Sequence, residues 1–180
     1  MIIGCLIAGF YGVLHNQISF TVSEEYFTKF KFIQFNIPPA IPERFGASIV
    51  GFLASWWMGI LIGIIIIPFG LIIPRWKDYF ISVIRAFGLV AITTFVIGLS
   101  ALICSLLIYD DDYTKELKVY GNSIININAF MMAGTMHNYS YLGGIVGIVV
   151  GGFWLILERK WAKSKINNTA QQGDAPEPES

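Results

Sequence analysis

Long apolar runs alternate with short polar segments along this chain. A transmembrane helix needs about 20 mostly apolar residues to cross the hydrocarbon core of a bilayer. Four runs approach or exceed that length, and they predict membrane-spanning helices over residues 1–22, 46–73, 80–109 and 139–157. The pattern therefore predicts an all-α membrane protein, a four-transmembrane-helix bundle within residues 1–166.

The first run is the least uniform of the four. It is cleanly apolar only to Leu14, after which His15, Asn16 and Gln17 interrupt it. A cleaved signal peptide is the competing interpretation. The run has neither a basic start nor an Ala-x-Ala cleavage site, so we expect the helix to be retained in the mature chain.

Composition agrees with lipid as the solvent. Hydrophobic residues make up 55% of the chain and charged residues 13%, with a mean hydropathy of +0.64, whereas soluble domains carry about 25% charged residues. The formal net charge is zero, so no overall field attracts nucleic acid. The expected partners are the lipid bilayer and either other membrane-protein subunits or a second copy of this chain.

The basic residues predict the orientation, because Lys and Arg resist translocation across the membrane. Arg75 and Lys77 follow the second run, and a basic cluster from Arg159 to Lys165 follows the fourth. Both segments, and with them both termini, are therefore expected to be cytoplasmic, in a multi-pass protein of the bacterial inner membrane. Residues 167–180 are too polar to form a core, and we predict a disordered cytoplasmic tail.

Small residues recur every four positions in two of the predicted helices. In the fourth helix they are Gly143, Gly147 and Gly151, and in the first Gly4, Ala8 and Gly12. Residues four apart share one helix face, and small ones let two backbones approach closely. This spacing predicts helix packing, and we favour contacts within the bundle over a homodimer seam.

Both histidines of the chain are expected at similar depth on the non-cytoplasmic side. His15 lies in the outer half of the first helix, His137 lies just before the predicted fourth helix, and Glu25 follows the first helix closely. Imidazole and carboxylate groups bind first-row metals, and two histidines on different helices can hold a b-type haem. The candidate metal ligands are therefore His15, His137 and Glu25. A structural hydrogen-bond cluster competes with this hypothesis and is favoured, because no HxH or HxxxH spacing is present.

Two blocks carry a family resemblance. The residues His15-Asn16-Gln17, followed by Glu25-Tyr26-Phe27-Thr28, resemble an uncharacterised family of small bacterial integral membrane proteins with an HDQ-like block and then an EYFT block. The later block from His137 to Gly144 extends the resemblance. It implies a membrane location and a region of interest but no reaction. Asn16 stands where the family pattern has aspartate, which removes one anionic ligand.

Two classes of function follow from these observations. The first is a structural or accessory subunit of a larger membrane complex, because nearly all of the chain is spanning helix. The alternative is a metal- or haem-binding membrane protein or oxidoreductase with its site on the periplasmic side. A small transporter is disfavoured, because the last three helices carry few ionisable residues at mid-depth. No CxxC, phosphate-binding loop or GxSxG occurs, so the common soluble catalytic signatures are absent and an enzyme is less favoured than a non-enzymatic role.

Overall fold

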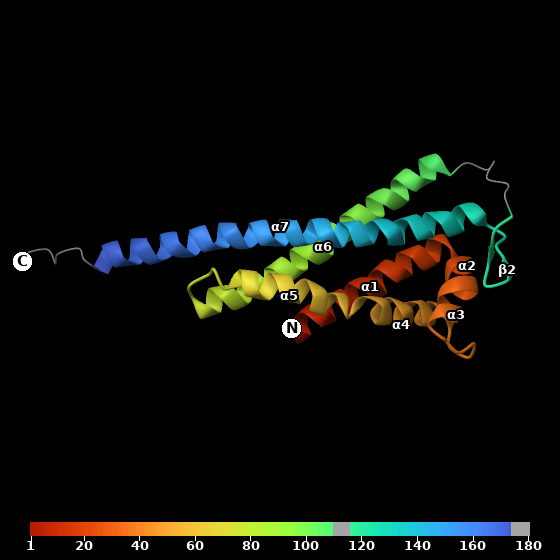
Figure 1. Ribbon diagram of the computed structural model, residues 1–180, viewed down its shortest axis with the longest axis horizontal. Helices are drawn as coiled ribbons and strands as arrows, with labels where there is room; N and C mark the ends of the chain where they lie inside the picture. The colour runs from red at the N-terminus through yellow and green to blue at the C-terminus, as the bar shows by residue number, and fades with distance from the viewer. Residues whose placement is uncertain (110–115, 174–180) are drawn as a thin grey trace, which may run out of the picture.

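The computed structural model describes residues 1–109 and 116–173, with side chains to residue 165. Within these ranges the chain is almost entirely helical, and four helical segments are long and apolar enough to span a membrane: 2–22, 43–70, 76–108 and 127–165. The predicted all-α, four-helix membrane fold is confirmed. Figure 1 shows the four segments running side by side, with the N-terminus and the described end of α7 away from the small cap formed by α2, α3 and β2.

The second span is divided into two helices. Where the sequence predicts one helix over 46–73, the structure has α4 (Glu43–Ser55) and α5 (Met58–Gly70), separated at Trp56 and Trp57. The amides of Gly59 and Ile60 bond to the carbonyls of Trp56 and Trp57, three residues earlier, at 3.1 and 3.0 Å. These short-range bonds tighten the backbone locally and separate the two helices.

The fourth span begins earlier than predicted. Helix α7 runs from Ile127 to Gly173, and the Asn126 side chain accepts a hydrogen bond from the amide of Ala129 at 3.0 Å at its start. His137 therefore lies inside a helix and not at its mouth, which corrects the predicted boundary at residue 139. The helix also continues through residues 167–173, which the sequence assigns to a disordered tail. The rest of that tail, 174–180, lies outside the described residues.

The helices associate as two closely packed pairs. Helix α1 (Ile2–Val22) packs along α4, and α6 (Trp76–Ile108) packs along α7. A side chain at Gly12 would meet the carbonyl oxygen of Gly51 at 2.1 Å, and one at Gly147 would meet that of Val90 at 2.9 Å. The remaining glycines that the sequence assigns to packing also face neighbouring helices of the same chain: Gly4, Gly143 and Gly151.

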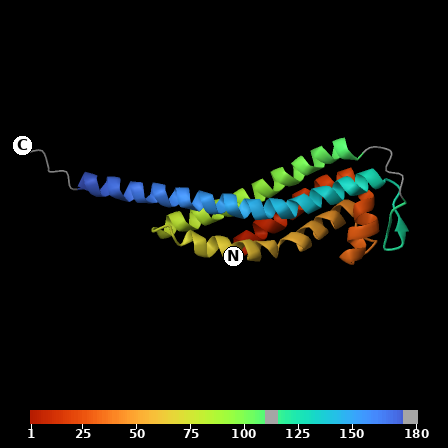
Figure 2. The same cartoon turned by 45° about the horizontal axis from the view of Figure 1, so that its top comes forward.

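The cap closes one end of the bundle. It consists of α2 (Glu24–Tyr26), a π-helical turn η1 (Phe27–Lys31), α3 (Phe32–Gln34), and a hairpin of β1 (Lys118–Val119) and β2 (Asn122–Ser123). The strands are antiparallel, with Lys118 opposite Ser123. Tyr120 and Gly121 make the turn with positive φ angles of 50° and 79°, as a two-residue hairpin requires. Figure 2 shows the cap beside the starts of α4 and α7.

Candidate functional site

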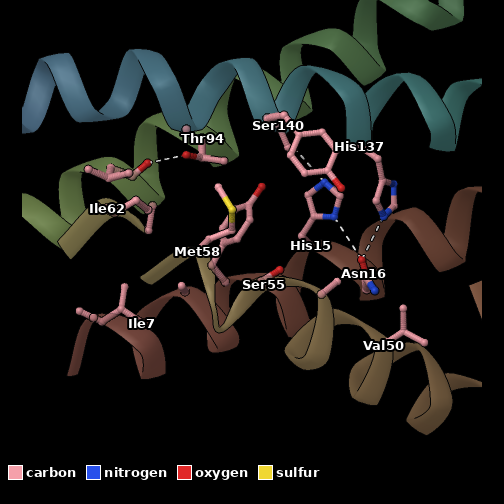
Figure 3. Close-up of a pocket in the computed structure, with 18 of the residues that line it drawn as sticks. Ile7, His15, Asn16, Val50, Ser55, Met58, Ile62, Thr94, His137 and Ser140 are labelled. Atoms are coloured by element: carbon pink, nitrogen blue, oxygen red, sulfur yellow. Dashed lines mark hydrogen bonds between the residues drawn. The ribbon is translucent and has the colours of Figure 1, made fainter. Parts of the chain in front are cut away.

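The structure brings the two histidines together in the bundle interior. His15 on α1 is 3% exposed, and the centroid of its ring lies 4.5 Å from that of His137 on α7, with the two rings nearly perpendicular. Figure 3 shows both rings pointing into the space between α1 and α7. The sequence prediction that these residues share one depth is supported by direct contact between them.

Asn16 links the two rings. Its Oδ1 lies 3.3 Å from His15 Nδ1 and 3.2 Å from His137 Nε2, as the dashed lines in Figure 3 show. Its Nδ2 donates to the carbonyl oxygen of Ala47 on α4 at 3.1 Å. Asn16 is 3% exposed. The carboxamide thus ties α1, α4 and α7 at one point.

The far side of each ring also has a polar partner. His137 Nδ1 lies 2.8 Å from the carbonyl oxygen of Ala133, one turn earlier in α7. His15 Nε2 lies 3.0 Å from the hydroxyl oxygen of Ser140, whose one hydrogen is donated to the carbonyl of Met136 at 2.9 Å. We refer to His15, Asn16, His137 and Ser140 as the histidine cluster.

Aromatic rings from the cap cover the histidine cluster. Tyr26 and Phe27 lie 4.9 and 6.2 Å from the His137 ring, centroid to centroid. Both belong to the segment in which α2 passes into the π-helical turn η1. A π-turn widens the backbone locally and is frequent at functional sites. Burial raises the pKa of the Tyr26 hydroxyl, so this ring stays neutral above His137.

A cavity of about 100 Å³ extends from the histidine cluster into the bundle. We refer to it as the central cavity. Most of its polar groups lie toward the cap end, while Ser55 and Thr94 lie farther into the bundle among apolar residues (Figure 3). The polar lining comprises Tyr11, His15, Asn16, Lys31, Ser55, Thr94, His137, Ser140 and Tyr141. The apolar lining includes Ile7, Val50, Ala54, Met58, Ile62, Phe87 and Val90.

Glu25 does not join the histidines, contrary to the sequence prediction. Its carboxylate accepts hydrogen bonds from the amides of Ile125 and Asn126, at 3.0 and 2.7 Å, and pairs with Lys29. Partial burial opposes its charge, but the bonds from Lys29, Asn126 and Ile125 hold the pKa of Glu25 below its usual range. Glu25 therefore closes the cap over α7 and has no carboxylate oxygen directed at the cluster.

The cluster does not have the form of the predicted metal or haem site. Among residues 1–109 and 116–165, no group of three or more His, Cys, Asp or Glu side chains is placed to hold a metal ion. Two axial histidines of a haem lie on opposite faces of a macrocycle, whereas these rings touch each other. Cofactor pockets measure about 300–1,000 Å³, well above the volume of the central cavity. The residues present do not fit either group.

Sequence reasoning missed three members of the site. Ser140 stands three positions after His137, and residues three apart share a helix face, so this spacing could have revealed it. The sequence marks Asn16 only as the residue that replaces the aspartate of the family pattern, whereas the structure shows that it links the two histidine rings. Lys31 lies in the π-helical turn and lines the cavity, and no pattern in the sequence marks that turn.

Comparison of the chain with protein-family models, with curated proteins and with solved structures gives no match. The resemblance to small bacterial membrane proteins therefore stays a prediction from the sequence. The four long apolar helices are those of a multi-pass integral membrane protein in contact with lipid.

Proposed function

We propose that this protein binds and releases a proton within the membrane at the histidine cluster. One observation carries the proposal: the Asn16 carboxamide oxygen lies within hydrogen-bonding distance of a nitrogen of each histidine, while the other polar atoms of Asn16 and His137 face carbonyl oxygens. Ionisable side chains inside a bilayer are costly and are commonly functional.

Counting hydrogens at His137 shows why a proton is involved. The carbonyl of Ala133 can only accept, so His137 Nδ1 must carry a hydrogen. Asn16 Oδ1 can also only accept, so in this arrangement His137 Nε2 must carry one too. An imidazole with hydrogens on both nitrogens is a cation. This orientation of Asn16 therefore matches the proton-bound form of the cluster.

The neutral form needs the opposite orientation of the same carboxamide. If Asn16 turns over, its NH₂ group donates to both His15 Nδ1 and His137 Nε2, and neither ring is charged. This orientation loses the hydrogen bond that Nδ2 now donates to the carbonyl of Ala47, because Oδ1 then faces that carbonyl oxygen. In the present arrangement the same count at His15, whose Nδ1 faces Asn16 Oδ1 and whose Nε2 faces a hydroxyl that donates to Met136, gives a second hydrogen on that ring. The two arrangements therefore differ by one flip of Asn16 and by one or two protons.

Few other titratable groups surround this position. Tyr11 of α1, Tyr26 of α2, Lys31 of η1 and Tyr141 of α7 lie around the cluster and the central cavity. Helices α4, α5 and α6 contribute no titratable side chain to the cavity wall. Lys31 is the one cation among these groups, and burial lowers its pKa. Uptake of a proton is thus assigned to the histidines.

The test is nitrogen NMR on the full chain in lipid nanodiscs with ¹⁵N-labelled histidine. On acidification the His137 ring should pass from one protonated nitrogen to two, and the Asn16 amide resonance should shift at the same pH. Asn16→Asp should hold the doubly protonated ring to a pH at least one unit higher, because a carboxylate accepts from both rings. A His137 ring that keeps one tautomer wherever the protein remains folded would overturn the proposal.

A second candidate is a subunit of a larger membrane complex in the bacterial inner membrane, with both termini cytoplasmic. It is favoured by an open apolar groove of about 560 Å³ between α1 and α6, lined by residues that include Leu6, Phe10, Leu14, Ile92 and Phe95. A helix of another protein would fill this groove. A photo-crosslinking residue at Phe10 should capture one discrete protein in membranes, whereas the same residue at the lipid-facing position Leu107 should not. Identical products at both positions would contradict this role.

A further inference from the structure

We propose that the central cavity binds the head and upper chain of a free fatty acid from the membrane, with the carboxylate beside Lys31 and His137 and the alkyl chain toward Ile62. This inference goes beyond proton binding and does not depend on it. Three features carry it: an unpaired cation at the cavity mouth, the order of polar and apolar walls, and a side of the cavity where the helices scarcely pack.

Lys31 is a cation without an anionic partner among the described residues. Its ammonium group donates to Gln34 at 3.0 Å and lies 4.5 Å above the centroid of the Phe30 ring. The other lysine of this segment, Lys29, is paired with Glu25. A partly buried ammonium that borders a cavity is stabilised by an anion, and a carboxylate forms a charge-assisted hydrogen bond with it.

The walls of the cavity are ordered as the parts of a lipid are ordered. Lys31, His137 and Asn16 lie at the cap end, where the chain leaves the membrane-spanning helices. Met58, Ile62 and Phe87 line the other end, within the spans, where the Thr94 hydroxyl donates to the carbonyl of Val90 in its own helix. A fatty acid in a bilayer has its carboxylate at the interface and its chain toward the midplane, so it would enter in this orientation without turning over.

One side of the cavity is the proposed route from the bilayer. Helix α1 packs closely on α4 and helix α6 on α7, whereas α4 and α7 scarcely touch. Yet α4 contributes Val50 and Ala54 to the wall, and α7 contributes Tyr141 and Gly144. We place the entry from the bilayer on that side, so that the rest of the alkyl chain remains in the bilayer.

The size of the cavity favours a single-chain acid. A volume of about 100 Å³ holds the equivalent of about three water molecules. This accommodates a carboxylate and a few methylene groups but not the head group of a phospholipid. Water alone would satisfy the polar end, but it would leave the apolar walls without contacts and Lys31 without a counter-charge.

The experiment measures oleate binding to the purified full chain by native mass spectrometry, with methyl oleate as the uncharged comparison. One oleate should bind per chain, and methyl oleate should bind about tenfold more weakly, the effect of one charge-assisted contact. In Lys31→Gln the two compounds should bind equally weakly. In Lys118→Gln, which removes an exposed cap lysine paired with Glu116, oleate binding should be unchanged.

A second pair of variants tests the position of the chain. A side chain at Gly144 would approach only the hydroxyl of Thr94, at 4.0 Å, so Gly144→Leu fills the cavity without a backbone clash. A side chain at Gly88 meets nothing within 4 Å and lies outside the cavity lining. Gly144→Leu should abolish stoichiometric oleate binding, and Gly88→Leu should retain it. A fatty acid with a diazirine on one of the first methylene groups after the carboxylate should label residues of the cavity wall, such as Val50 or Ala54.

Several outcomes would overturn the fatty-acid proposal. They are equal binding of oleate and methyl oleate, unchanged oleate binding in Lys31→Gln or Gly144→Leu, and labelling confined to outward-facing residues such as Phe10 or Ile92. Absence of any stoichiometric oleate would leave water as the occupant and would also overturn it. None of these results affects the NMR test of the histidines, so the two proposals fail separately.

Discussion

The carboxylate of Glu25 and the backbone amide of Asn126 are hydrogen-bonded at 2.7 Å, although 101 positions separate them in the sequence. The same carboxylate also accepts from the amide of Ile125 and pairs with Lys29. Asn126 immediately precedes α7, where the first amides of a helix have no partner within the helix itself. Glu25 therefore fixes the end of α7 that carries His137 against the segment that carries Tyr26.

Replacement of Glu25 tests this connection. Glu25→Ala leaves two backbone amides without their acceptor and leaves Lys29 only the carbonyl of Ser123, so we expect a loss of about 1–3 kcal/mol in unfolding free energy. Unfolding in mixed micelles, followed by circular dichroism, would measure it. Glu24→Ala removes the neighbouring exposed carboxylate and should change stability by less than about 0.5 kcal/mol. Equal effects of the two changes would contradict the role of Glu25.

Stability should also depend on pH through Glu25. Because its pKa in the folded protein is lowered, the stabilisation is fully present above the ordinary glutamate value of about 4.3. It is lost as the pH falls through the lower pKa of the folded state. Melting temperatures measured against pH should therefore fall on acidification in the native chain. They should fall less in Glu25→Gln, and parallel curves would exclude Glu25 as the source.

A double-mutant cycle tests the contact between the histidines. His15→Ala and His137→Ala each remove one partner of the Asn16 oxygen, and each should cost about 1–3 kcal/mol. Because the two rings touch and share that oxygen, the coupling energy should be about 0.5 kcal/mol or more. Unfolding free energies of the two single variants and the double variant measure it. Strict additivity would mean that the two rings do not interact in solution.

Gly147→Leu tests the close packing of α6 and α7. A Cβ at Gly147 lies 2.9 Å from the carbonyl oxygen of Val90, so a bulky side chain must push the two backbones apart. We expect a loss of more than about 2 kcal/mol in stability. Gly88→Leu is the matched control, since its Cβ meets nothing within 4 Å. Equal melting temperatures of Gly147→Leu and Gly88→Leu would mean that Gly147 does not face α6.

Reporter fusions test the orientation expected from the basic residues. A fluorescent protein that folds only in the cytoplasm should be active after the last residue or within the link that contains Arg75 and Lys77. A phosphatase that folds only in the periplasm should be active when inserted after Tyr120 in the cap hairpin. Reversed activities would place the cap, and with it the histidine cluster, nearer the cytoplasmic side.

The sequence by itself determined the class of fold. Apolar runs long enough to span a bilayer can form only helices when no closed barrel is available, because each backbone polar group must be paired within its own segment. For the same reason the number of spans and the approximate place of each were predictable. The spacing of Gly143, Gly147 and Gly151 also indicated a packing face, since helical periodicity alone places them together.

Only the tertiary structure decided how the polar residues are used. Whether His137 meets His15 depends on the rotation of α7 about its axis and on its start at Ile127, which the Asn126 side chain caps. Glu25 has a local partner in Lys29, four positions on, but its backbone partners are about a hundred positions away along the chain. The spacing to Lys29 alone did not separate it from the predicted metal ligands. Lys31 borders the cavity through a π-helical turn, and such a turn depends on packing more than on the residues within it.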